Sequence, residues 1–344
     1  MLKILKFPLI LLVLCLFIVL IAGGLVVVSA VLNLPTGNVA KDGVLFQITK
    51  GESSEHIFIR LEQEKIIRSS LLLRIVSKIF NTESALKSGI YRIKPEQTML
   101  DVHNLFISGK QEMKRITVRE GWTVAQIARS LEQEGLLSAP VFMQAGKSIA
   151  LLKKYGIPGS TVEGFLFPET YYFPQDVSAE LIIAKMIDTF FEKLAALVPE
   201  YKNYTAEELF KKVIVASIVE REYRKEDEAP VIASVFYNRL KIGQKLESCA
   251  TVAYVLTDVL GRPHPERLTY ADLEVQSPYN TYFATALPPG PIGNPGATAL
   301  ISAFFPADTT YRYFLLKDPL TGVHEFTESF QKHLTAKELY IKSY

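Results

Sequence analysis

Residues 205–223 read TAEELFKKVIVASIVEREY, and this stretch decides how the C-terminal half of the chain folds. Thr205 and Glu208 form a capping box, because each side chain can accept a hydrogen bond from the backbone N–H of the other residue. A helix therefore begins after Thr205 and continues through the apolar run that follows. A second helix is predicted over Ala229–Leu240, with Pro230 in its first turn.

Glu220 stands on a largely apolar stripe of the first helix. At about 100° per residue, it points to the same side as Val213, with Ser217 at the edge of the stripe. Glu222 points to roughly the opposite side, where we expect solvent to surround it. Burial disfavours the charged form of a carboxyl group and raises its pKa. Glu220 is therefore a candidate proton donor near neutral pH; the alternative is a structural ion pair with a buried arginine such as Arg239.

A loop rich in proline and glycine follows at residues 277–296, SPYNTYFATALPPGPIGNPG. Its composition excludes regular secondary structure and predicts a stiff loop. Tyr279 and Tyr282 supply flat apolar faces beside Asn280, whose amide offers two donors and an acceptor. This combination suits sugars, which present C–H faces and rings of hydroxyl groups. The alternative is a well-packed loop with a structural role.

The remaining C-terminal elements alternate between helices and strands. An amphipathic helix is predicted from Ser178 to Leu197. Two short strands, Tyr311–Leu316 and Val323–Phe326, flank a turn. We therefore predict an α+β fold in which the candidate acid lies on a helix.

An internal repeat occupies the N-terminal half. Residues 48–67 read ITKGESSEHIFIRLEQEKII, and residues 118–137 read VREGWTVAQIARSLEQEGLL, with six identical positions. Each copy predicts a short strand, a turn at Gly51 or Gly121, and an amphipathic helix. Such small units pack against neighbours to bury their apolar faces. The repeat is either a plain spacer or a glycan-binding module.

The N-terminus carries a long apolar segment, since no charged residue occurs from Phe7 to Leu34. At about 1.5 Å per residue, this segment exceeds the roughly 30 Å hydrocarbon core of a bilayer. Lys3 and Lys6 precede it, so the positive-inside rule places the N-terminus in the cytoplasm and the rest outside. The alternative is a signal peptide cleaved after Ala30, which exports the same part of the chain.

Composition excludes several other classes of protein. The chain has 344 residues and a formal net charge of +2, so nucleic acid is not an expected partner. Its two cysteines, Cys15 and Cys249, cannot form a disulfide framework. The five histidines show no spacing typical of metal ligands. We therefore predict an enzyme or binding protein without a metal or other cofactor.

Five segments stand out together: EGFLFPETY (163–171), ASIVERE (216–222), ASVFYNRL (233–240), the 277–296 loop, and YFLLKDPLTGVHEF (313–326). In this order they resemble the YceG/MltG-like family of endolytic murein transglycosylases. The resemblance covers essentially the whole chain, including the apolar N-terminus and the repeats, which then look LysM-like. Several independent motifs in order make a chance match improbable.

The resemblance implies a reaction and a set of site residues. Glu220 falls on the catalytic glutamate of the family's ASIVE motif. The family cleaves the β-1,4 bond between N-acetylmuramic acid and N-acetylglucosamine without water, because the muramic 6-hydroxyl attacks its own anomeric carbon and leaves a 1,6-anhydro end. One carboxylate can then serve as acid and afterwards as base, whereas glycosidases use two. The candidates for substrate binding are Tyr279, Asn280, Tyr282, Ser217 and Glu222.

The resemblance also implies an organisation and partners. The expected parts are a cytoplasmic tip and transmembrane helix (1–34), a linker (35–44), a LysM-like repeat region (45–155) and a catalytic domain (156–344). The protein would be a single-pass protein of the plasma membrane with its catalytic domain outside the cytoplasm. Its partners would be peptidoglycan glycan strands and peptidoglycan synthases.

One position departs from the family pattern. Cys249 and Ala250 stand where the family usually has Asp and Pro. If that Asp supports the site, a membrane-tethered, peptidoglycan-binding scaffold with weak or no catalysis is the alternative function. A further alternative function is a hydrolase that pairs Glu220 with a second carboxylate, Glu169 or Glu163. Such an enzyme would add water to its products.

Overall fold

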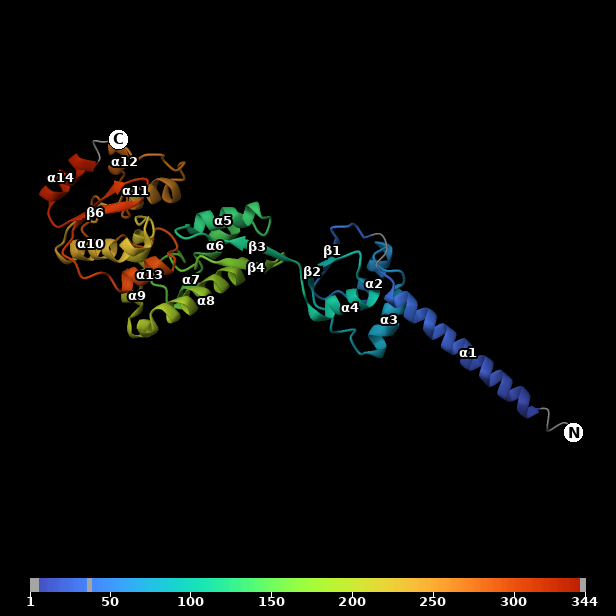
Figure 1. Cartoon of the computed structure of the whole chain (residues 1–344). Coiled ribbons are helices and arrows are strands. Elements are labelled where there is room, and N and C mark those ends of the chain that lie inside the picture. Colours follow the sequence, from blue (N-terminus) through green and yellow to red (C-terminus); the bar gives the residue numbers. More distant parts are fainter. Residues whose placement is uncertain (1–5, 36–38, 341–344) are drawn as a thin grey trace. The chain divides into compact units, whose positions relative to one another are not determined.

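The computed structural model describes residues 6–35 and 39–340. The chain divides into two compact units, of which the first runs to Lys114 and includes Pro174–Asp176, and the second holds the rest. Each unit combines helices with two-stranded sheets (Figure 1). The predicted α+β class is confirmed.

The apolar N-terminal segment forms one helix, α1 (Lys6–Asn33), as predicted. Its 23 residues from Leu11 to Asn33 have a mean hydropathy of 3.3 and could cross a membrane by length and composition, a test that a signal sequence also passes. Leu32, in the last turn, is buried in the core of the first unit. Lys3 and part of the predicted linker, residues 36–38, lie outside the described residues.

The first unit packs helices on an antiparallel strand pair. Its elements after α1 are β1 (Val44–Ile48), α2 (Ser54–Gln63), α3 (Ser70–Ile79), β2 (Gly89–Ile93) and α4 (Met99–Ser108). Phe46 of β1 lies opposite Tyr91 of β2. Both rings contact Phe106 of α4, which places the core between the sheet and this helix.

The second unit is larger and mostly helical. Its elements are β3 (Met113–Thr117), α5 (Val124–Gln133), α6 (Ala139–Ala145), α7 (Ile149–Tyr155), β4 (Thr170–Pro174), α8 (Ala179–Leu197), α9 (Ala206–Val219), α10 (Ala229–Lys241), α11 (Cys249–Tyr254), α12 (Tyr270–Leu273), α13 (Ala297–Phe304), β5 (Tyr313–Asp318), β6 (Val323–Thr327) and α14 (Phe330–Tyr340), with 3₁₀ turns at Pro199–Asn203 and Glu226–Glu228 and a π-helical turn at Val255–Val259. Strand β3 pairs with β4, and β5 pairs antiparallel with β6. The predicted helices and strands of this half of the chain are confirmed within a few residues.

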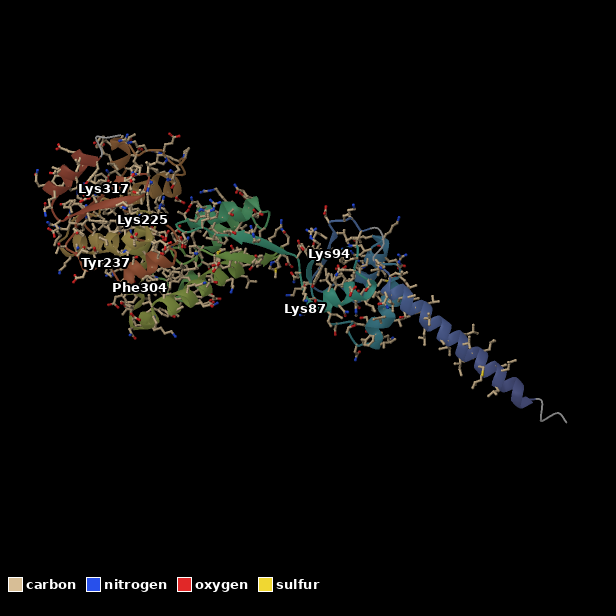
Figure 2. The ribbon with its side chains drawn as sticks, viewed as in Figure 1. Lys87, Lys94, Lys225, Tyr237, Phe304 and Lys317 are labelled. Carbon is tan, nitrogen blue, oxygen red and sulfur yellow. The ribbon has the colours of Figure 1, made fainter. Side chains whose placement is uncertain are left out.

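Helix α9 is the central element of the second unit and packs against α10 and α13. Every residue from Val213 to Val219 is buried, and Ser217 is the one polar side chain among them. Tyr237 of α10 donates a hydrogen bond to the Ala303 carbonyl of α13 at 2.7 Å, near Phe304 (Figure 2). The exposed polar residues of α9 lie in its first two turns, at Glu207, Glu208 and Lys211, and Glu220 directly follows its buried second half.

Both repeat copies form the predicted turn and helix, but the strands end at or just before the first residue of each copy, at Val44–Ile48 and Met113–Thr117. Gly51 and Gly121 take positive φ angles of +86° and +71° at the turns, a conformation that favours glycine. The helix of the first copy buries its apolar face in the first unit, and that of the second copy does so in the second unit. The compact units therefore divide between the two copies, after Lys114. The functional boundary between repeat region and catalytic domain at 155/156 stays a prediction.

Candidate active site

Glu220 caps the C-terminal end of α9 and is half-buried. Its Oε2 accepts a hydrogen bond from the Gly296 N–H at 2.9 Å, and the Tyr223 hydroxyl donates to its Oε1 at 3.4 Å. Burial raises the pKa of Glu220 to about 7, and the charge of Glu120 adds to the rise. A carboxyl group with this pKa can hold a proton at neutral pH and still release it, as a general acid must.

The predicted alternative, an ion pair between Glu220 and Arg239, is wrong. Arg239 donates to the carbonyl oxygens of Leu246 and Arg312, both at 2.6 Å, and lies 3.3 Å from a carboxylate oxygen of Glu247. These bonds tie the end of α10 to the loop after it and to the segment before β5. In the described part of the chain, Glu220 has no ion-pair partner.

The end of the Pro/Gly-rich loop is fixed against the turn that precedes α5. The Gly121 N–H donates to the Asn294 carbonyl at 2.8 Å, and the Asn294 N–H donates back to the Trp122 carbonyl at 2.8 Å. The buried Asn294 side chain donates to Trp122 as well, and it accepts from the Leu166 N–H at 2.8 Å. This double attachment positions Gly296, two residues later, so that its N–H meets Glu220.

Glycines permit the close approach of these segments. A Cβ atom at Gly293 would lie 2.6 Å from the Gly121 carbonyl oxygen, and one at Gly296 would lie 1.9 Å from Oε1 of Glu120. A Cβ atom at Gly121 would lie 3.5 Å from Cγ of Glu220. The turn of the second repeat copy therefore forms one wall of the candidate site.

Glu120 and Tyr223 also belong to the candidate site, and neither was predicted from the sequence. Tyr223 follows Glu220 by three residues at the end of α9, and its pKa is raised by burial and by Glu220. Glu120 lies a hundred residues earlier, in a repeat that sequence reasoning treated as a spacer or a glycan-binding module. One sequence difference could have pointed to Glu120: the first copy has Lys50 at the matching position.

The buried side chains of Ser217 and Glu163 hold backbone segments of the second unit in place. The Ser217 hydroxyl is buried, donates to the Ile214 carbonyl at 2.8 Å and accepts from the Ile292 N–H at 3.0 Å. Glu163 is also buried, and its two oxygens accept from the Val124 N–H at 3.1 and 3.0 Å. Both side chains thus hold backbone segments in place, and a direct substrate contact of Ser217 stays a prediction.

A cavity of about 570 Å³ lies beside the end of α9, and Glu222 lines it. The expectation that solvent surrounds Glu222 is wrong, because α9 ends at Val219 and the helical periodicity does not reach residue 222. Glu222 accepts a hydrogen bond from the Ser248 hydroxyl at 2.5 Å. Burial raises the pKa of Glu222. Glu220 is not among the residues that line this cavity in the described structure.

The three candidate residues of the Pro/Gly-rich loop differ in position. Tyr282 lines the cavity, and its hydroxyl lies 3.2 Å from the Cys249 sulfur. Asn280 is buried and donates to the carbonyls of Leu273, at the end of α12, and Val275, before the loop. Tyr279 is half-buried, with its ring 5.1 Å from that of Tyr254. Sugar contacts by Asn280 and Tyr279 stay predictions, since both side chains contact their own unit.

Glu169 is one of the two residues predicted as the second carboxylate of a hydrolase. It is exposed and forms an ion pair with Lys193 at 3.3 Å. A hydrogen bond from the Thr170 N–H and the Lys193 charge lower its pKa. Within residues 6–35 and 39–340, no group of three or more His, Cys, Asp and Glu side chains could hold a metal ion.

These features agree with the family that the sequence motifs suggested. The chain belongs to the YceG-like family, which matches it over residues 46–339. An endolytic murein transglycosylase of Bacillus subtilis is 32% identical over 94% of this chain and 92% of its own length. A protein of the same name from Streptococcus pneumoniae is 27% identical over 86% of this chain, which spans 58% of that relative.

A solved structure shows a similar fold. The crystal structure of a yceG-like protein from Listeria monocytogenes has 30% sequence identity and a TM-score of 0.58, and the match covers 86% of this chain and 99% of that one. The predicted family membership is therefore confirmed by sequence and by structure.

Proposed function

We propose that this protein is an endolytic murein transglycosylase that cleaves peptidoglycan glycan strands. Family membership and the names of its relatives support an enzyme of this kind. The observation that carries the proposal in this chain is the state of Glu220. Its pKa, about 7, suits a group that first gives a proton to a leaving oxygen and then takes one from a hydroxyl group.

The proposed reaction uses Glu220 twice. Protonated Glu220 donates to the glycosidic oxygen between N-acetylmuramic acid and N-acetylglucosamine as that bond breaks. The resulting carboxylate then accepts the proton of the muramic 6-hydroxyl, whose oxygen bonds to the anomeric carbon and closes the 1,6-anhydro ring. Because the nucleophile belongs to the substrate, no second carboxylate has to activate water. The Gly296 N–H favours the ionised form that exists between the two steps.

The cavity beside Glu222 is the proposed extension of the substrate site. Glu222, Tyr282 and Cys249 all line it, so two of the predicted binding residues share one space. The remaining candidates, Ser217, Asn280 and Tyr279, would act by shaping the loop. The LysM-like repeats would bind the glycan, and α1 would hold the enzyme in the plasma membrane close to newly made strands and their synthases.

The first experiment is replacement of the acid. Glu220→Gln keeps the size and the Gly296 hydrogen bond but cannot donate or accept a proton in the reaction. We expect release of anhydro-ended fragments from purified glycan strands to fall by about 10²–10⁴-fold. Thermal unfolding should stay near that of the unchanged protein. Near-normal release by the variant would refute the role of Glu220.

Product mass separates the proposal from its alternatives. The intramolecular reaction adds no water, so its fragments should be lighter by one water than the products of a hydrolase. Co-sedimentation with glycan strands and no products from the unchanged protein would instead indicate the scaffold that the Cys249 and Ala250 replacements allow.

A further inference from the structure

The second repeat copy contributes a carboxylate to the candidate site. Oε1 of Glu120 lies where a Cβ atom of Gly296 would be, 1.9 Å from that ideal position, so the carboxylate is packed on the Gly296 Cα. The N–H of the same Gly296 donates to Glu220. Glu120 and Glu220 thus contact one glycine from two directions, and Gly121 lies against the Glu220 side chain.

This arrangement is held by backbone bonds and is not a chance contact of a mobile side chain. The turn that carries Glu120 exchanges backbone hydrogen bonds with Asn294, which is itself buried. Gly296 lacks the side chain that would displace the Glu120 carboxylate. Its φ of −81° and ψ of −175° are extended values that any residue adopts, so the backbone does not require glycine there. The glycine is needed for the space that Glu120 occupies.

The two repeat copies differ at this position. The first copy reads Ile48-Thr-Lys-Gly51, whereas the second reads Val118-Arg-Glu-Gly121. The glycine has a positive φ in both turns, but only the second copy carries an acid directly before the glycine, and only the second turn lies against Glu220. The acid is thus specific to the copy that forms the wall of the site.

We propose that Glu120 is a positioning residue for Glu220: the second repeat copy belongs to the active site, and its exposed carboxylate keeps the proton on Glu220 until the glycan arrives. A negative charge beside a carboxyl group disfavours the ionised form of that group, and the charge of Glu120 raises the pKa of Glu220 in this way. Among the described residues, the titratable groups that face Glu220 are Glu120 from this turn and Tyr223 from the end of α9. This inference rests on the proposed function of Glu220.

The test is the pH dependence of fragment release by the full chain on purified glycan strands. In Glu120→Gln the negative charge is gone, so Glu220 should lose its proton at lower pH. We expect the decline of activity toward alkaline pH to begin about half a pH unit or more earlier, with near-normal activity in acid. Glu120→Asp keeps the charge and should keep the original profile.

Two further variants complete the test. Gly296→Ala should displace the Glu120 carboxylate and shift the profile in the same direction as Glu120→Gln. Glu134→Gln, an exposed acid at the end of α5, is the matched control and should leave the profile unchanged. An unmoved profile in Glu120→Gln, or an equal loss of activity at every pH, would overturn the inference. Normal activity of Glu220→Gln would instead overturn the proposed function itself, so the two failures are distinguishable.

Discussion

At the scale of single residues, Glu163 shows how a buried acid can serve structure and not catalysis. Its carboxylate accepts from the Val124 N–H, at the start of α5, and from the Asn294 side chain at 3.0 Å. It thereby joins the helix of the second repeat copy to the Pro/Gly-rich loop. Burial raises the pKa of Glu163 from 4.5 to about 8, so the folded protein retains a proton that the unfolded chain releases.

That pKa predicts a loss of stability as the pH rises. Because the pKa of Glu163 is higher in the folded state, protonated Glu163 contributes fully to the stability of the fold below pH 4.5, the pKa in the unfolded chain. This contribution is lost as the pH rises toward about 8, the pKa in the folded state. Glu163→Gln stays neutral and can still accept from Val124. We expect its melting temperature to fall less between these two pH values than that of the unchanged protein. Melting curves that respond to pH in parallel would contradict this assignment.

The sequence identified one acid of the site and not its neighbour for a physical reason. Glu220 could be identified from the sequence because helical periodicity and a family motif are both visible within a few neighbouring residues. Glu120 becomes part of the site only through backbone bonds between Gly121 and Asn294, which no local pattern contains. The position of Glu222 was misjudged because periodicity was extended past the end of α9 at Val219.

At the scale of elements, the two glycine turns of the repeat offer a matched comparison. Gly51 and Gly121 both have positive φ, so alanine at either position should cost roughly 1–2 kcal/mol of stability. A Cβ atom at Gly51 would meet nothing within 4 Å, whereas one at Gly121 would lie 3.5 Å from Cγ of Glu220. Only the second turn should therefore matter for activity.

We expect Gly121→Ala to lower fragment release by about 10-fold or more, because the strained turn shifts the wall that holds Glu220. Gly51→Ala should destabilise its own unit to a similar degree but leave release near normal. Thermal unfolding and initial rates on glycan strands measure both effects. Equal activity of the two variants would show that the second turn has no special part in the site.

Helices and strands were predicted well because their signals are local. The Thr205 cap and the amphipathic faces of both repeat helices appear in the structure as expected. The division into compact units was not predicted, because each repeat helix buries its face against a different core. The core against which a repeat helix packs is determined by the shape of the whole unit. The similar sequences of the two copies therefore do not reveal that their helices belong to different cores.

At the scale of the whole molecule, the proposed function requires α1 to remain attached to the catalytic unit. Its apolar residues from Leu11 to Asn33 are long enough to span a bilayer, and Leu32 packs into the first unit. Cleavage after Ala30 would leave Leu32 close to a new N-terminus and would release the enzyme from the membrane. Retention of α1 in a membrane would confine the proposed enzyme to glycan strands near the membrane surface.

We therefore expect the protein to stay with bacterial membranes after alkaline carbonate extraction and to retain residues before Ala30 when its N-terminus is determined. Protease added outside spheroplasts should digest the two units and spare the segment of α1 within the bilayer. Ile18→Arg places a charge mid-span at a cost of about 2.5–3.5 kcal/mol and should weaken membrane retention. A soluble protein whose N-terminus begins after Ala30 would establish cleavage, and the membrane part of the proposal would then be wrong while the chemistry of Glu220 stood unchanged.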